Sequence, residues 1–417
     1  MSSKLPIDPI ANRYGWVIVA VSTLALVVSN GLAIGGLPPF YKPVREEFIA
    51  IGAINANAAE SFIANSANIT FLMSGVFSLL GGWLITRYSL KPLMLVGCVL
   101  LGGGLIIHSQ ADTAVMVYLA RFLMGASLGF IGVAPNVVLV SNWFEIGRGT
   151  ALGIVLTGTS LGGTLIPLVA APLIALYGWR NAMLAISAIV WLVLLPAVIL
   201  LVKERQADME VARQDAGAEG MTLAEAVRTP LFWVFGLCAA LVFYPIFVTS
   251  QQFILYLQSP KIGVSAPTAA FAQSALFAVS IGGKFLAGYL SDKFTAVPVM
   301  AFCALLMFAS SLVLLSLNAG NALLFLLPFA LGYGGTFVLL QRLTADFFGC
   351  REAGKILGLI TLIEVVGAAI GGKITGYLAD QAGGDYTTAF YGVTITAGFA
   401  FVSTLVIHRL ASGRGKN

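Results

Sequence analysis

Long apolar stretches alternate with short polar turns along the whole chain. Twelve stretches are long enough to cross a bilayer as helices, because one span needs about 20 residues. They lie near residues 14–41, 61–86, 92–109, 114–141, 148–176, 180–202, 230–257, 267–291, 297–317, 322–347, 354–379 and 387–408. Runs of this length satisfy the backbone in lipid as helices. The pattern therefore predicts an all-α membrane protein with twelve transmembrane helices.

One long polar break divides six predicted helices from six. Thr222 and Glu225, near the end of the break, have the spacing of a capping box, which predicts a short surface helix. We therefore expect three parts: a first six-helix half at residues 1–202, a cytoplasmic linker with this helix at 203–229, and a second six-helix half at 230–417.

The two halves repeat at an offset of about 205 residues. Residues 82–88 after the second predicted helix are similar to residues 288–294 after the eighth. Trp143-Phe144 corresponds in the same way to Phe347-Phe348. Such a repeat predicts two parallel six-helix halves with a site between them.

Composition and charge agree with a membrane protein. Hydrophobic residues make up 59% of the chain and charged residues 10%, against about 25% charged in soluble proteins. The net charge of +5 does not indicate nucleic-acid binding, because the basic residues lie at segment ends. With both termini in the cytoplasm, fifteen Lys and Arg residues face that side and four face the other, which predicts this orientation. The four cysteines lack metal-site spacing, and we expect no cofactor.

Lys284 is the strongest candidate for a binding residue. It lies inside an apolar run, eight residues before Asp292 and therefore about 12 Å from the cytoplasmic surface. An ionisable residue at this depth is functional by default. Its ammonium is a point charge with three donors, which suits one carboxylate. The structural alternative is a permanently paired, inert lysine.

Glu364 lies nine residues beyond Lys355, about 13 Å from the same surface, and so at the depth of Lys284. This depth predicts an ion pair or a shared cavity. Burial and a nearby lysine act on a carboxyl group in opposite directions, so Glu364 is the candidate for proton coupling. The alternative is a fixed ion pair that only ties helices together.

Other polar residues are assigned more generally. Gln273 lies eleven residues before Lys284, near the same helical face, and is a candidate for substrate binding. Arg121 has two open roles, a structural bond to backbone carbonyls or a part in anion uptake. Four residues are candidate cytoplasmic gate contacts, with simple solvation as the alternative: Asp292, Arg148, Arg351 and Asp346.

These motifs together resemble a major facilitator superfamily transporter. Residues 288–293 are similar to the family's signature between paired helices, and residues 121–125 resemble its helix-4 motif. In the first half Thr86 replaces the usual aspartate, which leaves Arg87 and Lys91 of that charge cluster. Within the superfamily the chain is most similar to bacterial monocarboxylate transporter homologues and oxalate–formate exchangers, through the segments 14–17, 178–180 and 332–335.

The resemblance adds roles for individual residues. In these carriers a helix-8 cation binds the substrate carboxylate, and Lys284 stands at that position, where arginine is more frequent. The exchanger has a second cation in helix 11, where this chain has Glu364. Helices 1, 7 and 10 line the cavity in this family, which makes Asn30, Gln251 and Tyr333 candidates for the binding site. The resemblance also implies a monomer in the bacterial inner membrane.

We therefore expect a secondary active transporter of a small organic anion. The preferred prediction is a monocarboxylate moved with a proton by alternating access. An anion exchanger without proton coupling is the alternative. A non-transporting sensor would carry a signalling domain or a long tail, for which neither end of the sequence is long enough. A membrane enzyme would need a nucleophile next to a base, and His108 and His408 lie at segment ends.

Overall fold

The computed structural model describes residues 9–85, 88–144, 148–203, 220–318, 320–349 and 352–414. The first half contains α1 (Pro9–Asn30), η1 (Gly31–Gly35), α2 (Pro38–Ala50), η2 (Ala56–Ala58), α3 (Ala59–Ile85), α4 (Leu90–Ser109), α5 (Ala114–Ile131), α6 (Val133–Ser141), α7 (Arg148–Ile189), η3 (Val190–Leu194) and α8 (Leu195–Leu201). The second half contains α10 (Leu223–Ala226), α11 (Pro230–Leu257), α12 (Ala266–Phe294), α13 (Ala296–Ser311), η5 (Leu312–Ser316), α14 (Ala322–Phe348), α15 (Ala353–Gln381) and α16 (Thr387–Arg414).

The predicted transmembrane helices are confirmed. Eleven helical stretches in the described part of the chain are long and apolar enough to cross a membrane. One of them, Ala151–Leu201, has 51 residues, about twice the length of one span. It turns at Gly178, whose φ of 76° lies in the left-handed region that glycine adopts without strain. Because this stretch crosses twice, the eleven stretches make twelve crossings.

Two local features refine the sequence prediction. The first predicted span was expected to end near residue 41, but α2 continues to Ala50, beyond the apolar run. Its polar turn remains helical because Lys42 pairs with Glu46 within α2, while Arg45 and Glu47 pair with Glu60 and Arg180 of other segments. The predicted capping box is present at α10, where Thr222 and Glu225 satisfy each other's backbone amides.

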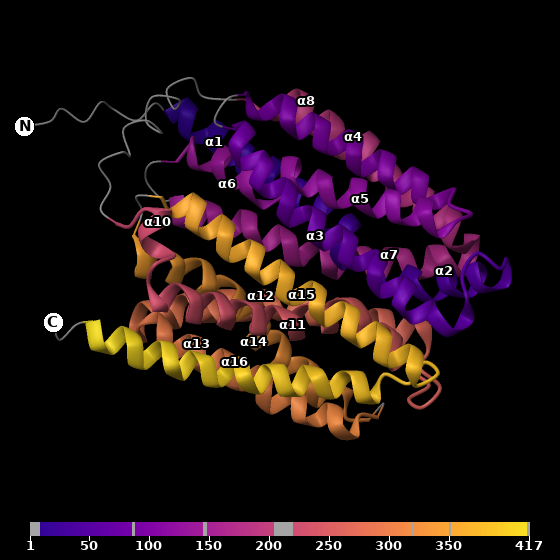
Figure 1. Cartoon of the computed structure of the whole chain (residues 1–417). Coiled ribbons are helices and arrows are strands. Elements are labelled where there is room, and N and C mark those ends of the chain that lie inside the picture. Colours follow the sequence, from indigo (N-terminus) through magenta and orange to yellow (C-terminus); the bar gives the residue numbers. More distant parts are fainter. Residues whose placement is uncertain are drawn as a thin grey trace, which may run out of the picture.

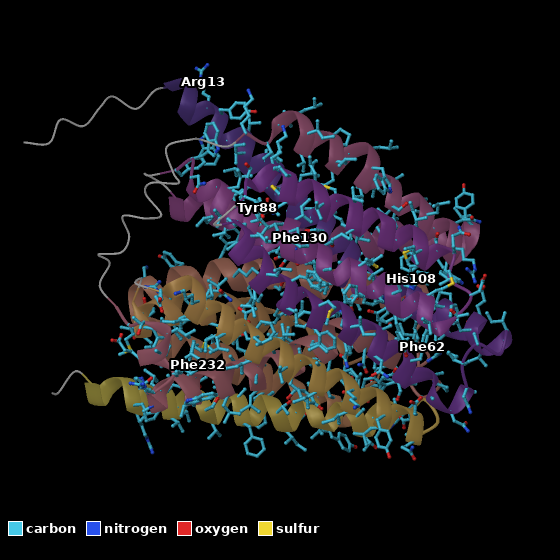
Figure 2. The ribbon with its side chains drawn as sticks, turned by 45° about the horizontal axis from the view of Figure 1, so that its top comes forward. Arg13, Phe62, Tyr88, His108, Phe130 and Phe232 are labelled. Carbon is cyan, nitrogen blue, oxygen red and sulfur yellow. The ribbon has the colours of Figure 1, made fainter. Side chains whose placement is uncertain are left out.

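The two halves lie side by side, and α1 begins at the same end of the bundle at which α16 ends (Figure 1). We call this end the terminal face and the other end the opposite face. Arg13 and Phe232 lie toward the terminal face, whereas Phe62 and His108 lie toward the opposite face (Figure 2). The halves meet along a seam formed by two helix pairs, α3 with α15 and α7 with α12. Residues on these helices can therefore contact the other half.

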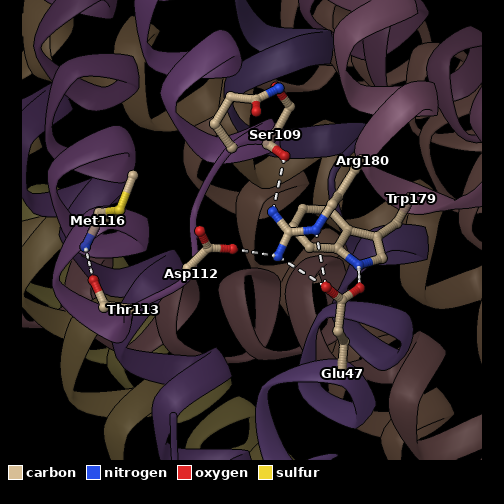
Figure 3. A network of polar contacts seen from close by, with 8 residues as sticks. Glu47, Ser109, Asp112, Thr113, Met116, Trp179 and Arg180 are labelled. Atoms are coloured by element: carbon tan, nitrogen blue, oxygen red, sulfur yellow. Dashed lines mark hydrogen bonds and ion pairs between the residues drawn. The ribbon is translucent and has the colours of Figure 1, made fainter. Parts of the chain in front are cut away.

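A polar network at the opposite face fixes α2 to the rest of the first half (Figure 3). The Glu47 carboxylate accepts hydrogen bonds from the Trp179 indole N–H and from Arg180 Nε, the latter at 2.9 Å. Arg180 also donates to the Ser109 carbonyl at 3.1 Å and to Asp112 at 3.0 Å. These bonds join α2 to the part of α7 beyond Gly178 and, through Arg180, to the end of α4, so α2 moves with the first half.

Candidate functional site

The Lys284 side chain bridges the seam between the halves. Its ammonium donates to Thr159 Oγ1 at 2.9 Å and to Ser160 Oγ at 2.7 Å, both on α7. It also lies 4.9 Å from the centroid of the Phe337 ring. The residue is 8% exposed, and no carboxylate of the described residues lies within ion-pair distance of it. A buried cation is therefore held by hydroxyl groups and an aromatic face.

Small residues make this arrangement possible. Ser160 Oγ also lies 3.1 Å from Ser280 Oγ, so the α7 hydroxyls fit closely against α12. A Cβ atom at Gly334 of α14 would lie 2.0 Å from the Ser280 carbonyl oxygen, which only glycine avoids. The close packing of α7, α12 and α14 thus fixes the position of the Lys284 backbone. Sequence analysis missed Thr159 and Ser160, although residues 158–163, all of them small except Leu161, mark a close helix contact.

Glu364 is buried on α15, 2% exposed, and its Oε1 atom has no hydrogen-bond partner. The ion pair with Lys284 that equal depth suggested is absent between these two described residues. The physical reason is that α15 packs against α3 and α11, whereas α12 packs against α7 and α14. The two charges belong to different helix pairs of the seam.

The structure separates the uncharged candidates into two groups. Tyr333 lies near Lys284: it is one turn before Phe337 on α14, and its ring centroid is 6.2 Å from that of Phe277, two turns before the lysine. Asn30 lies at the junction of α1 and η1, where its amide donates to the neighbouring Ser29 hydroxyl at 3.4 Å.

Gln273 and Gln251 lie toward the opposite face. The Gln273 amide donates to the Ser250 carbonyl of α11 at 2.6 Å, so both glutamines occupy one level of the second half. Gln273 precedes Lys284 by eleven residues, which separates this level from the lysine by about 16 Å. At the same level Gln251 Oε1 accepts a hydrogen bond from the Tyr41 hydroxyl at 2.6 Å. The lysine and the glutamines therefore do not form one compact site.

A set of polar contacts joins the halves at the opposite face, and sequence analysis missed it. Glu60 is 6% exposed; its carboxylate contacts Arg45 and accepts a hydrogen bond from the Tyr386 hydroxyl at 2.5 Å. The backbone N–H groups of Glu60 and Ser61 donate to the Asp380 carboxylate at 2.8 and 2.9 Å. Asp380 of the second half thus caps the α3 helix of the first. We call these four side chains, of Arg45, Glu60, Asp380 and Tyr386, the opposite-face clasp.

Asp385 precedes the clasp residue Tyr386 and orders the start of α16. Burial acts to raise the pKa of this carboxyl, but hydrogen bonds from the Thr387 hydroxyl and backbone N–H, with the charge of Lys261, outweigh it and lower the pKa. The Asp385 carboxylate is therefore ionised at neutral pH and holds the first turn of α16 in place.

For most of the candidate gate residues at the terminal face, the structure describes no side chain. Arg87 and Arg351 lie outside the described residues, and Arg148 and Asp292 are placed only by the backbone of their helices. Asp346 pairs with Arg342 one turn earlier on its own helix, at 3.6 Å. A gate at the terminal face therefore stays a prediction.

Replacing Asp380 with alanine should open the opposite face. Two hydrogen bonds to a charged acceptor, each worth about 1.5–3 kcal/mol, are lost only in the closed state. Ala64 of α3 packs closely against Gly376 of α15, because a Cβ atom at Gly376 would lie 2.5 Å from Ala64 Cβ. The accessibility of position 64 therefore measures whether the two halves are in contact at this face. A cysteine at Ala64 should react with a membrane-impermeant thiol reagent at least tenfold faster in the Asp380→Ala background, since a loss of about 1.4 kcal/mol already gives a factor of ten. Asp112→Ala is the matched control, since Asp112 is an exposed carboxylate at the opposite face that bonds to Arg180 within its own half. Equal labelling rates in both backgrounds would show that the clasp does not hold the face closed.

Comparison with known proteins places this geometry in a family. The sequence matches the model of the Major Facilitator Superfamily over residues 19–260 and 252–416. It is 25% identical to Monocarboxylate transporter 13 of Bos taurus, with 95% of this chain and 91% of that protein covered. It is 30% identical to the MFS transporter asaE of Aspergillus flavus, with 65% of this chain and 60% of that protein covered.

Solved structures share the same fold. A bacterial homologue of the human lysosomal transporter Spinster, in an inward-facing and occupied conformation, superposes with a TM-score of 0.74. The superposition covers 97% of this chain and 98% of that one at 13% sequence identity. This likeness concerns the arrangement of the helices.

Proposed function

The chain belongs to the major facilitator superfamily, and from this premise we propose that it carries a small organic anion, a monocarboxylate, together with a proton. It is a membrane transporter, as the family and its twelve crossings require. The observation that supports the substrate class is the buried Lys284 ammonium, which has hydroxyl partners but no carboxylate partner among the described residues. A substrate carboxylate supplies the missing charge.

The contacts of Lys284 suggest how binding is linked to movement. The ammonium belongs to the second half, while both hydroxyl partners belong to α7 of the first. A carboxylate that binds Lys284 competes with these hydroxyl groups for its N–H donors. Binding therefore weakens one contact across the seam and replaces it with contacts through the substrate. This exchange fits alternating access, in which two halves rock about a central site.

Glu364 is the proposed proton carrier. A bare carboxylate without a partner is costly in an apolar surrounding, and proton uptake removes that cost. A substrate anion in the same bundle adds a like charge, which favours the neutral form of Glu364 further. Proton and anion then cross together without net charge movement on the carrier. Exchange of one anion for another without a proton is the second candidate, favoured by the absence of a direct bond between Lys284 and Glu364.

We assign the terminal face to the cytoplasm of a bacterial inner membrane because, of the Lys and Arg residues at the ends of the predicted spans and in the segments between them, fifteen lie on that side and four on the other. The opposite-face clasp then closes the outer side of the carrier. In this orientation the structure corresponds to a state closed to the outside, and we propose a monomer as the functional unit.

A screen of carboxylates tests the substrate class. Purified protein should unfold at a higher temperature in the presence of at least one of formate, acetate, lactate, pyruvate and benzoate, because a bound anion stabilises only the folded state. Neutral amides of the same acids, such as lactamide, serve as controls and should have no effect. The same carboxylate should accumulate in reconstituted vesicles under an inward proton gradient. If an amide stabilises the protein as much as its acid does, the negative charge of the ligand is not what Lys284 recognises, and the proposed substrate class is wrong.

A further inference from the structure

Arg121 is a second buried cation that lacks a counter-charge. It lies on α5, is 2% exposed, and its Nε atom has no hydrogen-bond partner. No carboxylate of the described residues pairs with it, in contrast to Arg45 and Arg180, which contact Glu60 and Glu47. A guanidinium stays charged at every physiological pH, so it cannot avoid the cost of burial by losing a proton. The Tyr41 hydroxyl is a hydrogen-bond partner of the guanidinium, but no opposite charge among the described residues offsets its burial.

The surroundings of Arg121 are suited to an anion. Its guanidinium carbon lies 5.2 Å from the centroid of the Tyr41 ring, a cation–π contact that offsets only part of the cost of burial. The Tyr41 hydroxyl is hydrogen-bonded to the Gln251 side chain of the other half at 2.6 Å. The Gln251 amide makes one long bond, 3.4 Å, to the Ile34 carbonyl. A cation, a hydroxyl and an amide from both halves therefore meet at one level of the seam.

This level is distinct from that of Lys284. Arg121 is seven residues into α5, about 10 Å from the opposite face, whereas Lys284 is eighteen residues into α12, about 27 Å from it. The bond between Gln273 and Ser250 agrees with this spacing, since it places the Gln251 level eleven residues from the lysine. One small carboxylate cannot contact both cations at once.

Two of the three side chains at this level come from the first half and one from the second. Arg121 and Tyr41 both belong to the first half, and the Glu47 network keeps α2 in place there (Figure 3). Gln251 belongs to the second half and accepts the hydrogen bond of the Tyr41 hydroxyl across the seam in this structure. When the clasp opens, Arg121 and Tyr41 stay together and Gln251 moves away. The guanidinium then faces the solvent that enters from the opposite face.

We propose that Arg121, together with the Tyr41 hydroxyl, forms a second anion site that binds the carboxylate group of the substrate when the carrier is open at the opposite face. The guanidinium fork matches the two oxygens of a carboxylate, and the Tyr41 hydroxyl, freed from Gln251, donates a further bond. Closure returns Gln251 to Tyr41 and releases the anion toward Lys284. The inference rests on the proposed transport of an organic anion and adds an outer site to it.

Four variants separate this site from the one at Lys284: Arg121→Gln, Arg121→Lys, Lys284→Gln and the double variant Arg121→Gln/Lys284→Gln. Their thermal stabilisation by formate, acetate, lactate, pyruvate and benzoate is compared with that of the wild type. Lys284→Gln should keep part of the stabilisation, and the double variant should lose it all. If Lys284→Gln alone abolishes it and Arg121→Gln leaves it unchanged, the Arg121 site is refuted while the Lys284 site stands. If Arg121→Gln abolishes the stabilisation and Lys284→Gln leaves it unchanged, the Arg121 site is supported and the Lys284 site is refuted. No stabilisation of the wild type by any of the five acids refutes both.

A transport measurement keeps the test valid if Arg121→Gln does not fold. Arg121→Lys keeps the positive charge but loses the two-pronged geometry of the guanidinium. Transport is measured with the acid that stabilises the wild type most, added at the opposite face. Its KM should rise about tenfold, the effect of losing one charge-assisted hydrogen bond. The KM for the same acid added at the terminal face should change less than twofold. Tyr41→Phe should shift KM in the same one-sided way. A purely structural role would change both directions equally, and that result would overturn the proposal.

Discussion

Lys284→Ala should abolish carboxylate uptake into reconstituted vesicles and remove carboxylate binding at the Lys284 site, so that only binding at the proposed Arg121 site is left. Removing one partner of a buried charge pair costs about 2–5 kcal/mol, a loss of about 30-fold to several thousand-fold in affinity. The reason lies in the site itself: near the ammonium the described side chains provide hydroxyl groups and an aromatic ring, none of which can replace a cation. Lys284→Arg keeps the charge and should retain part of the binding, although its larger fork has to fit the close packing at Gly334.

The measurement is uptake of the carboxylate identified by thermal stabilisation, with binding measured on the same protein preparations. Lys293→Ala is the matched control, since Lys293 is an exposed lysine near the end of the same helix, with its ammonium 4.5 Å from the Tyr289 ring centroid. Thr159→Val adds a second comparison: it removes one hydroxyl partner, leaves the cation, and should preserve binding. Normal transport by Lys284→Ala would show that this lysine is a structural residue and would move the search for the anion site elsewhere.

Glu364→Gln should uncouple transport from the proton gradient while leaving anion binding intact. The glutamine mimics the protonated carboxyl, so the variant should bind the anion at least as well as the wild type. Proton binding and anion binding strengthen each other by the same factor, and a residue that cannot ionise removes this coupling. The pH dependence of anion affinity should therefore disappear. Anion-for-anion exchange should continue, because neither step of an exchange cycle needs a proton.

Uptake is compared with and without an inward proton gradient in the wild type, in Glu364→Gln and in Asp346→Asn. The last variant is the control, since Asp346 is an exposed carboxylate that pairs within its own helix. We expect gradient-driven accumulation in the wild type and the control, and equilibration only in Glu364→Gln. An unchanged gradient response in Glu364→Gln would assign the residue a structural role. A wild type that exchanges anions but ignores the gradient would favour the exchanger.

Several features could be predicted from the sequence because the physics that sets them is local. A run of about 20 apolar residues must form a helix in lipid, whatever its neighbours are. The helices were therefore found with their ends within a few residues, and the exception, α2, continued in a polar turn whose partners lie on other segments. The importance of Lys284 could be inferred in the same way, because a lysine in an apolar run has a cost that requires a functional or structural reason.

The partners of these charges could not be predicted in this way. Residue counting gives the depth of a side chain along its helix but not the direction in which it points or which helix faces it. Lys284 and Glu364 have similar depths, yet one contacts α7 hydroxyls and the other lies within a different helix pair. For the same reason Gln273, on the predicted face of α12, contacts Ser250 of its own half and lies about 16 Å from the lysine.

The sequence by itself determined the number of membrane crossings and the presence of a costly buried cation, since each follows from composition within one segment, and the two-half repeat, which follows from comparing two segments residue by residue. Only the tertiary structure decided that Thr159 and Ser160 hold this cation, that Asp380 caps a helix of the other half, and that Arg121 shares a level with Tyr41 and Gln251. Each of these contacts joins residues far apart in the chain. They depend on the rotation and packing of whole helices, to which many weak contacts contribute and which no single segment encodes.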